Sequence, residues 1–236
     1  MGAGPARARR AHARRVGLPA VIAACVAVCV LACAALVHAE WAQRPTLRIG
    51  AKLTASAAFV VLGTRGVATT EFGSWIFAGL VCGAIGDAAL LGRGSRAFLA
   101  GLGAFLAGHL LYVVAIVAVV PPADWLRLAG APAIAPVAVG LAALAMLWPR
   151  LGEMKGPVIV YVGAICAMVI GALAIARGGV LGEPRGCVFA VGATLFFVSD
   201  LAVARDRFGT RAFANRAWGL PAYYAGQLLI AWAACP

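Results

Sequence analysis

Residues 157–176 read PVIVYVGAICAMVIGALAIA and contain no charged side chain. An α-helix advances by about 1.5 Å per residue, so about 20 mostly apolar residues are needed to cross the hydrocarbon core of a bilayer. The run has this length and is bounded by segments that contain Arg, Pro and Gly. The stretch therefore predicts a membrane-spanning helix.

The same pattern recurs along the chain. Windows of this length find eight apolar runs, at approximately 16–37, 47–63, 73–92, 97–120, 133–148, 157–176, 186–204 and 218–234. Pro132 and Pro136 break the fifth run, which is also short. Hydrophobic residues make up 64% of the chain and charged residues 12%, with a mean hydropathy of +0.96, which excludes a water-soluble enzyme. We expect an all-α, polytopic transmembrane bundle of about eight helices.

Basic residues gather at the N-terminus. The net charge is +12, and five of the 20 Lys and Arg residues lie in the first fifteen positions. They are Arg7, Arg9, Arg10, Arg14 and Arg15. Most other basic residues lie between apolar runs, which favours membrane anchoring over nucleic-acid binding. We expect a basic tail over 1–15, a single integral membrane domain over 16–236, a location in the cell membrane and no nucleic-acid partner.

The first apolar run has two interpretations. Its Arg-rich start and the small-residue sequence Val37-His38-Ala39 are typical of a cleaved signal peptide. Its length exceeds a usual signal core, which favours a retained helix. Basic residues on the loops give conflicting signals for orientation, so sidedness stays open.

The cysteines predict neither a metal site nor a disulfide framework. The seven cysteines form no CxxC pair and no cluster with histidine. Cys25, Cys29 and Cys33 recur every four residues inside an apolar run, as small helix-packing residues do. We expect no metal and no cofactor.

Two of the eight acidic residues, Asp87 and Asp200, lie inside apolar runs. Each is close to the end of its helix, and the helical rise places both roughly 6 to 8 Å below the same membrane face. Lys52, Tyr161 and Tyr223 lie on helices that begin at that face and reach about the same depth. Because ionisable groups cost a few kcal/mol each in hydrocarbon, this layer predicts a half-buried polar pocket.

Further polar residues surround this predicted pocket. Gln227 and His109 lie deeper, at about 14 and 18 Å. Tyr112 shares a helix face with His109, and Gln227 shares one with Tyr223, because residues three or four apart are neighbours on a helix. Four arginines on the aspartate side would form a cationic rim. They are Arg93, Arg96, Arg205 and Arg207.

Each of these residues also has a purely structural interpretation. A lone aspartate can pair with Lys52 or fix helix packing, although two at matched depth favour a function. His109 alone is more often a satisfied interior histidine, and Tyr161 and Tyr223 can be interfacial anchors. The alternative function is a non-enzymatic transporter or lipid-binding protein whose aspartates relay protons or hold helices together.

Residue combinations in five helical regions occur in a fixed order. They are Gly86-Asp87 with Leu90; Phe98, Gly101, Phe105, Gly108, His109 and Tyr112; Met154, Pro157-Val158, Tyr161 and Met168; Phe196, Ser199-Asp200, Ala204 and Arg207-Phe208; and Tyr223, Tyr224, Ala225 and Gln227. Together they resemble the YhhN family of polytopic membrane proteins, which includes lysoplasmalogenases. The resemblance covers most of the chain after the first run. One departure is Lys52-Leu53, where the family often has Lys-Pro.

The resemblance implies an eight-helix bundle that hydrolyses the vinyl-ether bond of a lysoplasmalogen. The products would be a fatty aldehyde and glycerophospho-ethanolamine or glycerophospho-choline. This chemistry needs an acid that protonates the β-carbon, a group that stabilises the oxocarbenium ion, and a base for water. The hypothesis is that one of Asp87 and Asp200 stays protonated as the acid while the other is ionised and directs water, with the assignment open.

The remaining candidates would support this pair. His109, Tyr112, Tyr161, Tyr223 and Gln227 would supply hydrogen bonds. Lys52 would hold the ionised aspartate or contact phosphate, and the four rim arginines would bind the head group. The partners implied are a lysophospholipid substrate and membrane lipids.

Overall fold

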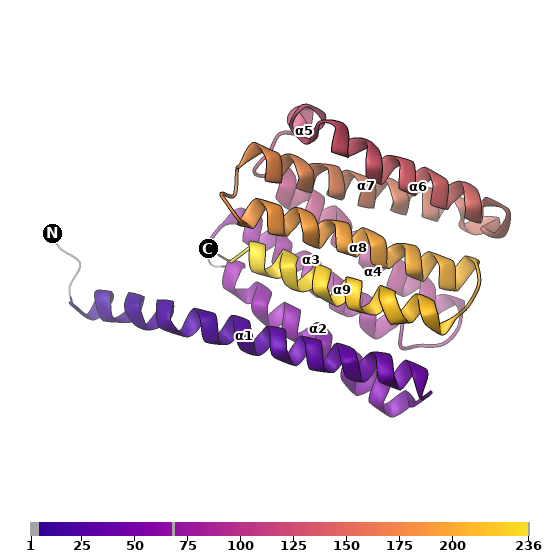
Figure 1. Cartoon of the computed structure of the whole chain (residues 1–236), viewed down its shortest axis with the longest axis horizontal. Coiled ribbons are helices and arrows are strands. Elements are labelled where there is room, and N and C mark those ends of the chain that lie inside the picture. The colour runs from indigo at the N-terminus through magenta and orange to yellow at the C-terminus, as the bar shows by residue number, and fades with distance from the viewer. Residues whose placement is uncertain (1–4, 68, 236) are drawn as a thin grey trace.

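The computed structural model describes residues 5–67 and 69–235, with side chains described from residue 19 onward. Within these ranges, eight long helices lie side by side in a bundle (Figure 1). They are α1 (Pro5–Trp41), α2 (Pro45–Val67), α3 (Glu71–Ala89), α4 (Ser95–Val117), α6 (Ile134–Leu147), α7 (Lys155–Gly178), α8 (Arg185–Phe208) and α9 (Phe213–Ala233). A short helix, α5 (Trp125–Ala129), lies between α4 and α6.

The prediction of an all-α polytopic bundle is confirmed. Seven helical segments of the described chain are long and apolar enough to cross a membrane. The eighth predicted helix, α9, is present with 21 residues, but Arg216, Tyr223 and Gln227 lower its mean hydropathy and it is not among the seven. The Pro-interrupted fifth run also forms a helix, α6, which begins after a 3₁₀ turn at Ala131–Ala133.

Two details differ from the sequence prediction. The first helix begins at Pro5, inside the predicted basic tail, and continues to Trp41. Residues 1–4 and the side chains of residues 5–15 lie outside the described part of the protein, so the role of the tail stays a prediction. The short helix α5 was not predicted, because its five residues are too few to give a periodic pattern.

Local signals mark the helix ends. The Thr70 side chain accepts a hydrogen bond of 3.0 Å from the Gly73 backbone amide and caps the start of α3. At the C-terminal end of α7, Gly179 has a φ of 64°, a left-handed conformation that glycine adopts without a steric penalty. These signals mark where α3 begins and where α7 ends.

Glycines allow the closest helix contacts. A Cβ atom on Gly192 of α8 would lie 2.9 Å from the carbonyl oxygen of Gly226 in α9, so these two backbones are in direct contact. In α3, a Cβ atom on Gly79 would overlap the Tyr112 ring of α4. Small residues let helices approach in this way inside a membrane, where burial of apolar surface against lipid provides little driving force.

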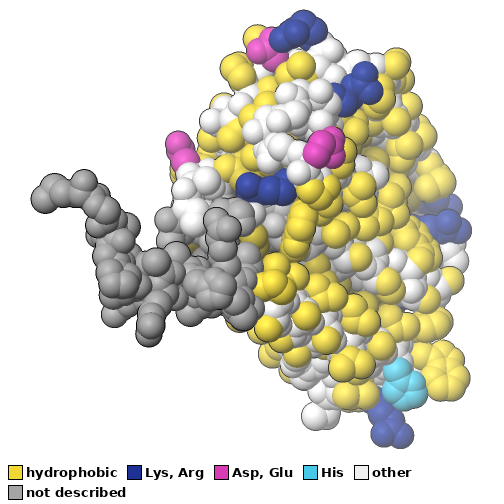
Figure 2. Space-filling view, turned by 60° about the vertical axis from the view of Figure 1, so that its left-hand side comes forward, with side chains coloured by type: hydrophobic (Ala, Val, Ile, Leu, Met, Phe, Trp, Pro, Cys, Tyr) yellow, Lys and Arg dark blue, Asp and Glu magenta, His cyan; other side chains and the backbone are white. Residues whose placement is uncertain are grey.

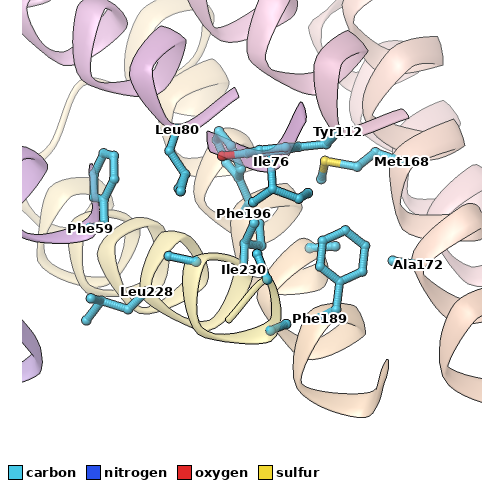
Figure 3. Close-up of a cluster of buried hydrophobic side chains, with 14 of the residues drawn as sticks. Phe59, Ile76, Leu80, Tyr112, Met168, Ala172, Phe189, Phe196, Leu228 and Ile230 are labelled. Carbon is cyan, nitrogen blue, oxygen red and sulfur yellow. The ribbon is translucent and has the colours of Figure 1, made fainter. Parts of the chain in front are cut away.

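The interior is filled by large side chains from most of the helices. Phe59 of α2, Ile76 of α3, Tyr112 of α4, Met168 of α7 and Phe196 of α8 are all 1% exposed or less. They belong to one cluster of buried side chains, to which α9 also contributes (Figure 3). This core fixes the positions and rotations of the helices that carry the polar residues described below.

The outer surface is apolar as well. Figure 2 shows hydrophobic side chains over most of the visible face, with few charged groups among them. Leu31, Leu126, Ile134 and Leu141 are each at least 60% exposed. A surface of this kind is stable against lipid chains rather than against water. The chain is therefore an integral membrane protein, while its location in the plasma membrane remains a prediction.

Candidate functional site in a polar cavity

A cavity of about 920 Å³ opens at the end of the bundle where α1 passes into α2, on the right in Figure 1. Five residues predicted from sequence to share one layer all line it: Lys52 of α2, Asp87 of α3, Tyr161 of α7, Asp200 of α8 and Tyr223 of α9. Each lies within a few turns of the end of its helix that faces the cavity opening. Five helices thus bring their polar residues to one cavity.

Asp87 is held by three donors. Lys52 Nζ lies 2.8 Å from Asp87 Oδ1, and the Ser56 hydroxyl donates a hydrogen bond of 2.6 Å to Oδ2. The Tyr224 hydroxyl donates to the same oxygen at 3.4 Å. The Asp87 side chain is only 2% exposed, and the Lys52 side chain 11%. The pair is an almost fully buried ion pair in which the ammonium balances the carboxylate.

Asp200 has different neighbours. The Tyr161 hydroxyl donates a hydrogen bond of 2.9 Å to Asp200 Oδ2, and His109 Nε2 lies 3.5 Å from the same oxygen. Among the described residues, no lysine or arginine lies within ion-pair distance of this carboxyl group. The Asp200 side chain is 15% exposed, so it is more accessible from the cavity than Asp87.

His109 lies beneath Asp200 and does not line the cavity. Its side chain is fully buried, and neither ring nitrogen has a hydrogen-bond partner among the described residues. Its ring centroid lies 4.5 Å from that of Phe196 and 5.1 Å from that of Tyr161. A buried imidazole without partners is costly, so its proximity to Asp200 needs an explanation beyond packing.

A second set of buried groups lies behind Tyr223. The Tyr112 hydroxyl donates a hydrogen bond of 2.8 Å to Gln227 Oε1, and Gln227 Nε2 donates one of 3.4 Å to the Tyr223 hydroxyl. Tyr112 and Gln227 are fully buried and do not line the cavity. A Cβ atom on Gly83 would lie 2.5 Å from Gln227 Nε2, so this glycine leaves room for the amide. The set orients Tyr223 toward the cavity.

The structure places two of the four predicted rim arginines in the lining of the cavity. Arg93 and Arg207 line the cavity, whereas Arg96 and Arg205 do not. Four other arginines that line it were not among the predicted site residues. They are Arg44, Arg48, Arg211 and Arg216. All four lie on loops or helix ends at the aspartate side of the membrane, and this shared position was the available sequence signal.

Ion pairs connect several of these arginines across the opening. Arg216 of α9 contacts Glu40 of α1 at 3.1 Å and Asp206 of α8 at 3.0 Å. Arg48 also pairs with Glu40, at 3.7 Å. Arg44, Arg93 and Arg207 have no carboxylate at ion-pair distance among the described residues. The Arg207 guanidinium instead lies 4.4 Å from the Phe98 ring centroid. The opening therefore carries cationic groups that no carboxylate of the described part of the chain neutralises.

Two neighbours of Asp87, Ser56 and Tyr224, were also not among the predicted site residues. Ser56 is four residues after Lys52, so both lie on one face of α2, and this spacing could have identified it. Tyr224 follows Tyr223 directly, and its side chain reaches Asp87 while Tyr223 lines the cavity. Among the described residues, no group of three His, Cys, Asp or Glu side chains is arranged to hold a metal.

The apolar helices and the polar cavity between them define a polytopic membrane protein. The chain belongs to the YhhN family, whose family model matches residues 47–234. It is 34% identical over 161 residues to a protein of Mycobacterium bovis named "Lysoplasmalogenase" and 35% identical over 158 residues to "Lysoplasmalogenase TMEM86A" of Bos taurus. It is 31% identical over 157 residues to "Uncharacterized membrane protein YhhN" of Escherichia coli O157:H7.

These matches cover part of each protein. Each includes 66% of this chain, and they span 58% of the mycobacterial protein, 63% of the bovine protein and 71% of the E. coli protein. No solved structure matches the chain significantly.

Proposed function

We propose that the protein is a membrane-embedded hydrolase that cleaves the vinyl-ether bond of lysoplasmalogen-type lysophospholipids. The relatives named lysoplasmalogenase support the reaction class. The observation that carries the proposal for this chain is that Asp87 and Asp200 line one cavity with opposite electrostatic surroundings. Two carboxyl groups in unlike environments can divide the roles of acid and base between them.

In this proposal Asp200 is the acid. It has no lysine or arginine counter-charge among the described residues, and an unpaired carboxylate in a low-dielectric interior is costly, so the protonated form is the one to expect there. Its proton would pass to the β-carbon of the vinyl ether and create an oxocarbenium ion at the α-carbon. The Tyr161 hydroxyl, 2.9 Å from Asp200 Oδ2, would then stabilise the carboxylate that remains.

Asp87 is the ionised partner. Lys52 balances its charge at 2.8 Å, and Ser56 occupies its second oxygen. The carboxylate would stabilise the cationic intermediate and direct water to its α-carbon. Addition of water gives a hemiacetal, which collapses to a fatty aldehyde and the alcohol of the glycerophospho head group. The water would lose one proton to Asp87 as it adds. On collapse, the hemiacetal hydroxyl would pass its proton to Asp200, and Asp87 would pass its proton to the departing glycerol oxygen. One water molecule is consumed, and both carboxyl groups return to their starting states.

The cationic opening is proposed to bind the phosphate of the head group. Among the described residues, Arg44, Arg93 and Arg207 line it without carboxylate partners. Arginine binds phosphate through paired N–H donors. Arg207 is also placed by a hydrogen bond of 3.4 Å to the Ser95 hydroxyl. His109, Tyr112 and Gln227 would act from behind the cavity wall as positioning residues, and Tyr223 would act from the wall itself.

A direct assay tests the function. The full chain, purified in detergent, is incubated with a vinyl-ether lysophospholipid or with its ester-linked counterpart. Free aldehyde and water-soluble head group are then measured by mass spectrometry. We expect both products from the vinyl ether and none from the ester. A folded preparation that releases no aldehyde, but transports protons in vesicles, would replace the hydrolase with a transporter.

A further inference from the structure

The cavity extends beyond the polar site into an apolar part. On this side its lining comes from α4, α6, α7 and α8, and includes Leu102, Ala143, Leu144, Val162, Ile165 and Leu201. We call this part the apolar arm. Leu144 and Val162 pack against a small hydrophobic cluster formed by Leu147, Leu151 and Val158. These contacts place this part of the lining between α6 and α7.

The apolar arm passes directly beside the candidate acid. Val158, Tyr161 and Ile165 all line the cavity and lie on one face of α7, because they are three and four residues apart. Tyr161 is the residue that donates a hydrogen bond to Asp200. A molecule that occupied the arm would thus have one end of its chain next to Asp200.

The depth of the arm follows from helix geometry. Ile165 is the eleventh residue of α7, which begins at Lys155 beside the opening, so it lies about 15 Å along the helix. The hydrocarbon core of a bilayer is about 30 Å thick. Ile165, which lines the arm, therefore lies at about the middle of the membrane.

The two ends of the cavity match an amphiphile with one chain. At the opening, Arg44, Arg93 and Arg207 offer positive charge without carboxylate partners among the described residues. The arm offers only apolar side chains, beneath α6, the least buried of the seven candidate membrane helices. We propose that the apolar arm binds the hydrocarbon chain of a lysophospholipid and that Ala143 and Leu144 determine which chain lengths fit. The inference rests on the proposed function for the class of ligand.

Ala143 and Leu144 are suited to this role by size and position. Both are half-buried residues of α6 that line the arm. A larger side chain at Ala143 would fill the arm, and a smaller one at Leu144 would widen it. Ala142 is the neighbouring residue, is exposed on the outer face of α6 and does not line the cavity. The same substitution at Ala142 and Ala143 therefore separates filling of the arm from any general effect on α6.

The test measures binding without chemistry. Saturated alkyl-ether lysophospholipids lack the vinyl double bond, so they probe the arm without undergoing the proposed reaction. Decyl, tetradecyl and octadecyl forms are titrated into the full-length wild type and the Ala143→Phe, Leu144→Ala and Ala142→Phe variants in detergent, with bound lipid measured by native mass spectrometry. We expect Ala143→Phe to lower the octadecyl-to-decyl affinity ratio about tenfold, as a hydrophobic pocket does when a few methylenes no longer fit. Leu144→Ala should raise the ratio, and Ala142→Phe should leave it unchanged.

The outcomes separate this inference from the proposed function. Equal ratios for Ala143→Phe and Ala142→Phe, an unchanged ratio for Leu144→Ala, or no binding of any chain to the wild type would each overturn the chain site. The expected shifts together with no cleavage of a vinyl ether would support the chain site and contradict the hydrolase. Cleavage of the vinyl ether with unchanged affinity ratios would support the hydrolase and contradict the chain site.

Discussion

Asp87 and Asp200 line one cavity but differ in their neighbours and in their exposure. Asp87 is 2% exposed and accepts bonds from Lys52, Ser56 and Tyr224, so its charge and its position are both fixed. Asp200 is 15% exposed, and its neighbours are Tyr161 and His109, whose ring nitrogens have no hydrogen-bond partner among the described residues. The difference indicates that Asp87 is a fixed, charge-balanced carboxylate, while Asp200 is a more accessible carboxyl group without a cationic partner among the described residues.

Removal of the Asp200 carboxyl group should have the largest effect on activity. Asp200→Asn keeps the shape of the side chain but cannot donate an acidic proton, so we expect aldehyde release to fall by about 10² to 10⁴-fold. The thermal stability in detergent should change little, because Tyr161 can still donate a hydrogen bond to the new amide oxygen. Both quantities are measured on the same preparation.

A matched control is the same substitution at an exposed aspartate. Asp124 lies in the connection before α5, where its carboxylate pairs with Arg127. Asp124→Asn should leave aldehyde release unchanged. If Asp200→Asn retains the activity of this control, Asp200 is not the acid.

Asp87→Asn should lower the stability of the protein as well as its activity. Asp87→Asn leaves the Lys52 ammonium in the interior without its counter-charge, which costs about 3 to 5 kcal/mol of stability when a buried ion pair is broken. We expect a clear fall in the thermal unfolding temperature in detergent, together with loss of aldehyde release.

The double variant Lys52→Met with Asp87→Asn distinguishes the ion pair from a local packing defect. Because it removes both charges, it should recover much of the stability that Asp87→Asn loses, while aldehyde release stays lost. A double variant no more stable than Asp87→Asn would show that the buried lysine charge is not the cause.

The sequence predicted the layer of the site better than its contacts. The helical rise alone places Lys52, Asp87 and Asp200 at one depth, and the structure brings them to one cavity. Which neighbours touch each carboxyl group depends on how far each helix is rotated about its axis, and packing of the core sets that rotation. Tyr223 and Tyr224 illustrate this, since adjacent residues of α9 reach different parts of the site.

The same limit applies to the rim. Arg205 and Arg207 are two residues apart at the end of α8, so the helix turns them to different sides, and only Arg207 lines the cavity. The local sequence contains both arginines but does not show which of them faces the cavity. The order of the motifs carried the resemblance to the YhhN family, and the family membership is confirmed. The roles of individual residues remain predictions.

Two tyrosines provide the finest test of the contrast between the carboxyl groups. Tyr161 donates a hydrogen bond of 2.9 Å to Asp200, and Tyr224 donates a longer one of 3.4 Å to Asp87, which Lys52 and Ser56 already hold. Tyr161→Phe should lower aldehyde release about 10- to 100-fold, since the loss of one hydrogen bond to a carboxylate is worth roughly 1.5 to 3 kcal/mol. Tyr224→Phe should lower it by about twofold at most, because a weak bond is lost and two strong partners remain. Equal losses in the two variants would mean that both carboxyl groups depend on their tyrosines alike, and the division of roles between Asp200 and Asp87 would then have no basis.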